Sequence, residues 1–204
     1  MDFFSGSGTV AHGVMLANAE DGGRRRYIMV QLPEACGKNS PLGRRGFSNI
    51  CEAGKERIRR TAERIAGDLD RGFRVLKLDT ANMKDVYYTP DAYETGLLDS
   101  LADNIKEDRT PEDLLFQVML ELGILLSSKI EESTVAGKRV FTVAEGELMA
   151  CFDADVTEEA IREIAGKRPR HFVLRDSSMA SDSVAANFEQ IFAAYSPQTV
   201  RKVL

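Results

Sequence analysis

The chain has 204 residues, of which 43% are hydrophobic and 29% are charged, and its formal net charge at pH 7 is −5. This is the balance of a globular protein, and it excludes a disordered tail and a coiled coil. No apolar run approaches the roughly 20 residues of a membrane-spanning helix, and the first residues lack the basic and apolar regions of a signal peptide. We therefore expect a cytoplasmic protein without membrane contact.

The first half of the sequence predicts an alternation of turn, helix and strand. Within the first expected helix, Val10, Val14 and Ala17 lie on one side. Residues 27–32 are nearly all apolar, which is typical of a strand covered on both faces. The order of elements predicts a parallel sheet with right-handed crossover helices. The expected elements are a glycine-rich turn at 4–9, helices at 9–19 and 48–66, and strands at 27–32 and 73–78.

The second half predicts a junction and then a compact α/β domain. Residues 80–108 are polar and aromatic, with a helix expected at 93–105. Thr110, Pro111 and the acids after them are a strong helix start, because they supply a cap, a proline at the first position and negative charge in the first turn. The elements expected after this helix are strands at 139–143, 147–152, 171–175 and 199–203, and helices at 157–165 and 183–194. We place the domain boundary between residues 108 and 109.

Cysteines and histidines are few and far apart in the sequence. There is no pair of cysteines with two residues between them. The pattern therefore predicts neither a disulfide framework nor a metal site, and it favours thiols in a reducing compartment. The residues concerned are Cys36, Cys51, Cys151, His12 and His171.

The net negative charge argues against a chain that grips duplex DNA alone. Neutralisation of phosphates supplies most of the affinity of such proteins and needs a basic surface. The basic clusters here are short, at 24–26, 44–45 and 59–60, and each is expected on a solvated face. If the chain takes part in DNA binding, other segments must supply most of the affinity.

The glycine-rich turn at 4–9 could bind a ligand or be a plain tight turn. Glycine accepts positive φ and lets the backbone approach a ligand closely, and a helix that follows offers free N–H donors. Residues 6–11 fit the dinucleotide fingerprint. That motif, however, follows a whole apolar strand and is followed by an acid about 20 residues later. Only three residues precede the turn, Glu34 comes late, and no His, Lys or Tyr constellation is visible, so a nicotinamide-dependent oxidoreductase is disfavoured.

Longer blocks of the sequence resemble a known family. Asp-Phe-Phe-Ser-Gly-Ser-Gly-Thr resembles the S-adenosylmethionine-binding loop of amino-group DNA methyltransferases, whose pattern is Asp-x-Phe-x-Gly-x-Gly-Thr. Six collinear blocks, which together cover essentially the whole chain, resemble the modification subunit of type III restriction–modification systems. They are SGSGTVAHGVMLANAEDGGRRRYIMVQLPE, GFSNICEAGKERIRR, GFRVLKLDTANMK, RTPEDLLFQVMLELG, GELMACFDADVTEEAI and RDSSMASDSVAANFEQIF.

The resemblance implies a fold and a set of cofactor-binding residues. The fold is α/β, with part of a Rossmann-like methyltransferase sheet in residues 1–108 and a small mixed α/β domain, with a role in assembly, in 109–204. The glycines let the loop pass under S-adenosylmethionine. The carboxylate of Glu34, just after the strand expected at 27–32, accepts the ribose hydroxyls. Without the resemblance, that acid would equally suit a surface position. The expected cofactor-binding residues are Asp2, Phe4, Ser5, Gly6, Ser7, Gly8, Thr9 and Glu34.

The resemblance also implies an incomplete enzyme. In this permuted class the catalytic Asp-Pro-Pro-Tyr segment precedes the cofactor loop, and neither it nor Asn-Pro-Pro-Tyr occurs here. The complete enzyme flips an adenine out of the duplex and methylates its N6. We therefore expect a C-terminal portion without catalytic residues, which methylates no DNA alone and binds S-adenosylmethionine weakly or not at all. Its opening loop should be mobile or repositioned, and its open sheet edge should recruit a second copy.

The partners implied are the remaining N-terminal part of the methyltransferase, the restriction subunit and a second modification subunit. Duplex DNA would be contacted only through the full complex. A different class of function stays open, in which the last third of the chain is an interaction module that docks partner subunits and the cofactor loop is vestigial.

Overall fold

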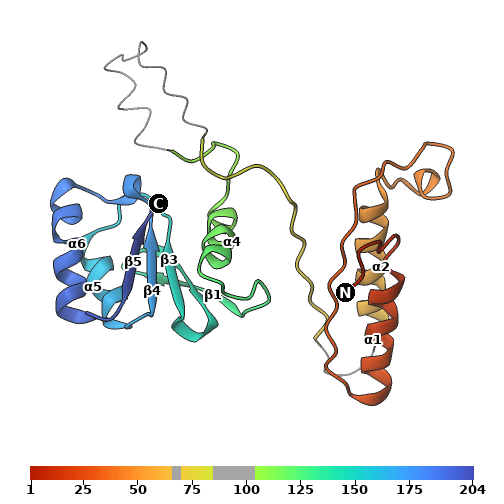
Figure 1. The fold of residues 1–204 in the computed structure, drawn as a ribbon, viewed down its shortest axis with the longest axis horizontal. Coiled ribbons are helices and arrows are strands. Elements are labelled where there is room, and N and C mark those ends of the chain that lie inside the picture. Colours follow the sequence, from red (N-terminus) through yellow and green to blue (C-terminus); the bar gives the residue numbers. More distant parts are fainter. Residues whose placement is uncertain (66–69, 85–103) are drawn as a thin grey trace, which may run out of the picture. The chain divides into compact units, whose positions relative to one another are not determined.

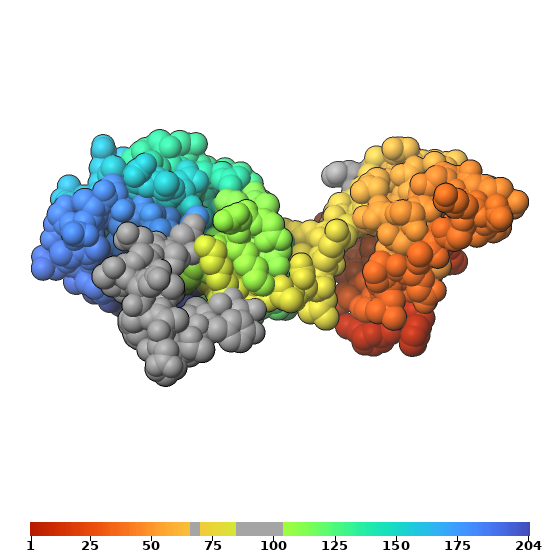
Figure 2. Space-filling model, turned by 90° about the horizontal axis from the view of Figure 1, so that it is seen from above, coloured from red at the N-terminus to blue at the C-terminus, as the bar shows by residue number. Residues whose placement is uncertain are grey.

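The computed structural model describes residues 1–65, 70–84 and 104–204, in two compact units, Met1–Val75 and Leu76–Leu204 (Figure 1). We call these the N-terminal and C-terminal units. Each has its own hydrophobic interior, and its elements are closely packed in the space-filling view (Figure 2). The compact units divide at residues 75 and 76 because Met83 and Ile105 pack with the C-terminal core. The functional division expected at residues 108 and 109 stays a prediction.

The N-terminal unit is built on two helices, α1 (Thr9–Asp21) and α2 (Ile50–Arg64), with a 3-10 turn η1 (Gly43–Arg45) between them. Helix α2 begins after Asn49, whose side chain accepts the Glu52 N–H at 3.0 Å. Both helices were predicted. The side of α1 that carries Val10, Val14 and Ala17 is not the buried one, because Ala11 and Met15 are buried whereas Val10 is exposed. Apolar residues occur all round α1, so packing against α2 selects the buried side.

The strands expected at 27–32 and 73–78 do not form in the described residues. One parallel bridge joins Asp2 to Met29, where the Asp2 N–H donates to the Ile28 carbonyl at 2.9 Å and the Val30 N–H donates to the Asp2 carbonyl at 2.8 Å. A ladder needs a partner with several extended residues in register, and among the described residues only Asp2 pairs with residues 27–32 in this way. The predicted parallel sheet of this unit is therefore reduced to a single bridge among the described residues. The two paired segments run parallel, as expected.

The C-terminal unit contains a mixed five-stranded sheet with strands in chain order β1–β5 (Figure 1). Strands β1, β2 and β3 are antiparallel, and β3, β4 and β5 are parallel. The strands are β1 (Ile130–Val135), β2 (Lys138–Val143), β3 (Leu148–Cys151), β4 (His171–Leu174) and β5 (Val200–Val203). The helices are α4 (Pro111–Glu121), α5 (Glu158–Gly166) and α6 (Asp182–Tyr195), with 3-10 turns η2 (Ala144–Gly146) and η3 (Asp176–Ser178).

Most of these elements were predicted to within two residues. Strand β1 was missed, because it is an edge strand whose central residues are exposed and polar. It is joined to β2 by Ala136 and Gly137, both at positive φ, which is the geometry of a tight hairpin turn. The helix expected at 93–105 falls, except for its last two residues, outside the described part of the chain.

Helices cover both faces of this sheet, with α5 and α6 on one side and α4 on the other (Figure 1). Alternate strand residues supply the two cores, as the pleat of a strand requires. Phe172 and Leu174 of β4 pack with α5 and α6, whereas Val173 between them packs with α4. The mixed α/β class expected from the sequence is thus confirmed. Among the described residues, no helix has the length and hydrophobicity needed to cross a bilayer.

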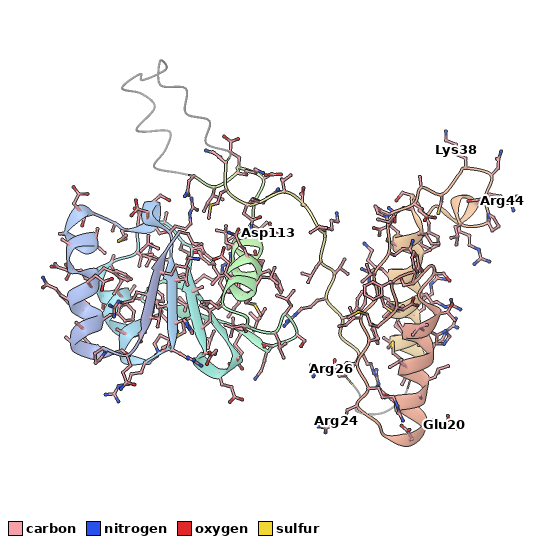
Figure 3. All side chains as sticks on the ribbon, in the orientation of Figure 1. Glu20, Arg24, Arg26, Lys38, Arg44 and Asp113 are labelled. Atoms are coloured by element: carbon pink, nitrogen blue, oxygen red, sulfur yellow. The ribbon has the colours of Figure 1, made fainter. Side chains whose placement is uncertain are left out.

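Helix α4 begins with a capping box, in which Thr110 Oγ1 accepts the Asp113 N–H at 3.3 Å and Asp113 Oδ2 accepts the Thr110 N–H at 2.8 Å. Asp113 is labelled at the start of this helix in Figure 3. Thr110→Ala should lower the free energy of unfolding of the C-terminal unit by about 1 kcal/mol, because the Asp113 amide loses its side-chain acceptor. Urea denaturation measures this. Thr110→Ser keeps the hydroxyl and should retain most of the stability, so equal losses in the two variants would contradict the prediction.

Candidate functional site

The glycine loop, residues 4–9, follows the Asp2–Met29 bridge and leads directly into α1. Its backbone is held by short hydrogen bonds, since the Ser5 N–H donates to the Val30 carbonyl at 3.2 Å and the Gly8 N–H donates to the Ser5 carbonyl at 2.8 Å. Gly6 and Gly8 have φ values of 51° and 76°. Other L-residues rarely adopt this region, so the structure explains why the loop carries glycine at both positions.

Side chains from two distant segments support the glycine loop. The Gly6 N–H donates to Gln31 Oε1 at 2.8 Å. Arg57 Nη1 of α2 donates to Ser7 Oγ at 2.9 Å and to Thr9 Oγ1 at 2.5 Å. These supporting contacts were not predicted from the sequence, because the family resemblance assigned no role to Gln31 or Arg57 and because they lie 25 and 50 residues from their partners.

Gly54 of α2 lies directly against the loop backbone. A Cβ atom added to Gly8 would meet the Gly54 carbonyl oxygen at 3.3 Å, and one added to Gly54 would meet the Gly6 carbonyl oxygen at 3.4 Å. A glycine inside a regular helix costs about 1 kcal/mol relative to alanine. Its presence in the middle of α2 was therefore the one sequence signal that could have revealed this close approach.

The start of α1 presents unused hydrogen-bond donors. No side chain of the described residues caps this end, and its first turn contains no acidic residue. The first amides of a helix have no partner within the helix, and they lie at the positive end of its dipole. The hydroxyls of Ser7 and Thr9 accept from Arg57, which leaves their own protons available as donors. This end of the N-terminal unit is thus suited to a polar or negatively charged ligand group.

Two of the other expected site residues, Phe4 and Glu34, are exposed to solvent. Phe4 is 89% exposed, and its N–H donates to Asp2 Oδ1 at 3.1 Å. Glu34 is exposed, and its backbone carbonyl accepts the Ile50 N–H at 3.0 Å, next to the start of α2. Among the described residues its carboxylate has no hydrogen-bond partner. The structure thus joins residues 2–9 to Gln31, and Glu34 follows three residues later in the chain.

The basic clusters are not gathered on the glycine loop. Arg24 and Arg44, labelled in Figure 3, project from the N-terminal unit away from its helix pair, and Lys38 lies in the same loop as Arg44. Arg60 forms a 2.7 Å ion pair with Glu56 one turn earlier on α2. Within residues 1–65, 70–84 and 104–204, no three His, Cys, Asp or Glu side chains come together as a metal site would require.

Comparison with known proteins identifies relatives of one kind, although no protein-family model matches the chain. The chain is 28% identical to the EcoP15I Mod subunit of Escherichia coli over 207 residues, which is 93% of the chain and 28% of that relative. It is 40% identical to the StyLTI Mod subunit of Salmonella typhimurium over 39% of the chain and 13% of the relative. It is 34% identical to the EcoPI Mod subunit of Escherichia phage P1 over 37% of the chain and 12% of the relative.

The structure defines an α/β protein with a glycine-rich loop at the start of its first helix. All three relatives are Mod subunits of type III restriction-modification enzymes, and one of them aligns with nearly the whole chain. The chain is therefore a relative of these modification subunits, and the resemblance seen in the six sequence blocks is confirmed. It spans about a quarter of the length of the relative that it matches most fully.

Proposed function

We propose that the chain supplies the S-adenosylmethionine-binding loop and the C-terminal unit of a DNA adenine-N6 methyltransferase in a type III restriction–modification system. The observation that carries this proposal is the glycine loop. It is preshaped at positive φ, it ends at an uncapped helix, and it lies in a chain whose relatives are modification subunits. The bound donor supplies an activated methyl group, and the residues of this chain hold it.

The side chains around the loop fit such a donor. The free amides of α1 and the hydroxyls of Ser7 and Thr9 can donate to the carboxylate of its methionine part. The exposed ring of Phe4 offers an apolar face. The free carboxylate of Glu34 can accept both hydroxyls of the ribose. Around Gly6, an added Cβ would meet nothing closer than 4.0 Å, so the loop backbone is open to a ligand there.

The catalytic segment belongs to other polypeptide in this proposal. The sequence contains no Asp-Pro-Pro-Tyr, and the chain matches only 28% of the EcoP15I Mod subunit. Apolar residues that a parallel sheet would cover are open to solvent here. Phe3 is 62% exposed, Leu32 is 73% exposed, and Ile28 is also exposed. The missing part of the methyltransferase completes the sheet here. Without it, the donor has half a pocket and binds weakly.

A second candidate function belongs to the C-terminal unit, whose two-sided core is complete while the N-terminal sheet is not. In this alternative the unit docks the restriction subunit or a second modification subunit, and the glycine loop is vestigial. The specific observation in its favour is the outer strand β5, where Val200 and Val203 are exposed at the edge of the sheet. Edge strands of this kind can pair with another chain. Contact with duplex DNA would then come only through the assembled complex.

Titration of the ¹⁵N-labelled chain with S-adenosylmethionine tests the proposal. We expect the amide signals of Gly6, Gly8 and Glu34 to shift at millimolar donor, whereas NAD at the same concentration should not shift them. A Kd about tenfold lower is expected when a polypeptide that carries the Asp-Pro-Pro-Tyr segment is added, because the pocket is then closed. Shifts caused by NAD alone, or no shifts even with that polypeptide present, would refute donor binding and leave the docking function.

A further inference from the structure

Arg57 has a place in the site that the proposed function does not use. It lies in the third turn of α2 and is half-buried, whereas its neighbours Arg59 and Arg60 are exposed. One of its guanidinium nitrogens, Nη1, donates to hydroxyls on both sides of Gly8, those of Ser7 and Thr9. A single side chain thus fixes the last part of the glycine loop and the first residue of α1.

The same face of α2 also carries the glycine that contacts the loop. Gly54 and Arg57 are three residues apart and therefore lie on one side of the helix. A Cβ added to Gly54 would be 3.4 to 3.6 Å from backbone atoms of Gly6, Ser7 and Gly8. Gly54 lets the loop backbone rest on the helix, and Arg57 binds its side chains beside that contact.

We propose that Arg57 is a positioning residue, which holds the glycine loop in the conformation that binds the methyl donor. This inference rests on the proposed function. A loop with two glycines has many accessible conformations, so it must lose entropy on binding unless it is already ordered. Two hydrogen bonds from a charged donor supply that order in the ligand-free chain. They also polarise the two hydroxyls, which makes each hydroxyl a better donor to a ligand.

The geometry calls for arginine at this position. The planar guanidinium presents fixed N–H vectors, whereas the ammonium of lysine is a compact charge on a flexible stem. A lysine should therefore keep the charge and lose most of the order. This distinguishes a positioning role from a general electrostatic attraction between the helix and a negatively charged ligand.

The experiment uses the full ¹⁵N-labelled chain, its Arg57→Gln and Arg57→Lys variants, and Arg60→Gln as the matched control on the same helix. Hydrogen exchange of the Gly6 and Gly8 amides is measured without ligand, and the Kd for S-adenosylmethionine is measured by titration. We expect Arg57→Gln to raise both the exchange rates and the Kd by about tenfold. Arg57→Lys should recover less than half of this effect, and Arg60→Gln should change neither quantity. The Ile58 amide shows whether α2 is intact in each variant.

A double-mutant cycle identifies the contact that matters. If Arg57 acts through the two hydroxyls, then Arg57→Gln should have almost no further effect on exchange in a chain that already carries Ser7→Ala and Thr9→Val. Unchanged exchange in Arg57→Gln, an equal effect of Arg60→Gln, or full additivity in the cycle would overturn the proposal. If the wild-type chain shows no response to the donor even with the Asp-Pro-Pro-Tyr polypeptide present, the proposed function fails, and the exchange arm still decides whether Arg57 orders the loop.

Discussion

Replacement of Phe172 by alanine will lower the free energy of unfolding of the C-terminal unit by about 3–5 kcal/mol, because it empties the centre of the core between the sheet and its two helices. Phe172 on β4 has no exposed surface. Its ring stacks on Phe192 with centroids 5.2 Å apart, and it lies 6.1 Å from the ring of Phe188, both on α6. Urea denaturation followed by far-ultraviolet circular dichroism measures the loss.

Phe4→Ala provides the matched control for this prediction. It removes the same number of atoms, but the Phe4 side chain is 89% exposed. The free energy of unfolding should therefore change by less than about 0.5 kcal/mol. A loss in Phe172→Ala no larger than that in Phe4→Ala would mean that the aromatic cluster does not hold this unit together.

The second large effect concerns methyl transfer. We expect the purified chain to transfer no labelled methyl group from S-adenosylmethionine to duplex DNA. The exocyclic amine of adenine is a poor nucleophile because its lone pair is delocalised into the ring. The chain contains no Asp-Pro-Pro-Tyr to hold that amine. Enzymes typically accelerate reactions by a factor of about 10⁶ or more, so the loss of the catalytic segment should bring transfer to the background rate.

Addition of a polypeptide that carries the catalytic segment should restore transfer, and this supplies the positive control. Gly8→Val in the present chain should prevent the restoration. A β-branched residue is strained at a φ of 76°, and its Cβ would lie 3.3 Å from the Gly54 carbonyl. Incorporation of label by the chain alone would show that its own residues activate the amine, and it would end the proposal that the catalytic segment is elsewhere.

Local signals were sufficient for most of the C-terminal unit. The cap at Thr110, the 3.6-residue periodicity of Leu114 to Leu122 and the short apolar strands each predict an element that the structure contains. These signals act within a few residues along the chain, which is why the sequence alone reveals them. The six sequence blocks also identified the modification subunits as relatives, and the comparisons confirm this. Two further expectations stay predictions: that the opening loop is mobile or repositioned, and that the open sheet edge recruits a second copy.

By itself, then, the sequence determined to within two residues where the described helices begin and end, where strands β2 to β5 lie and where the glycine loop must bend. Only the tertiary structure decided that residues 27–32 form one bridge in place of a ladder, because strand formation depends on hydrogen bonds to a separate segment. It also decided which side of α1 is buried and which residues support the loop. Gln31 and Arg57 reach that loop across 25 and 50 residues of chain. Hydrogen bonds at such separations leave no periodic signal in the sequence, because they depend on how distant segments come together in the fold.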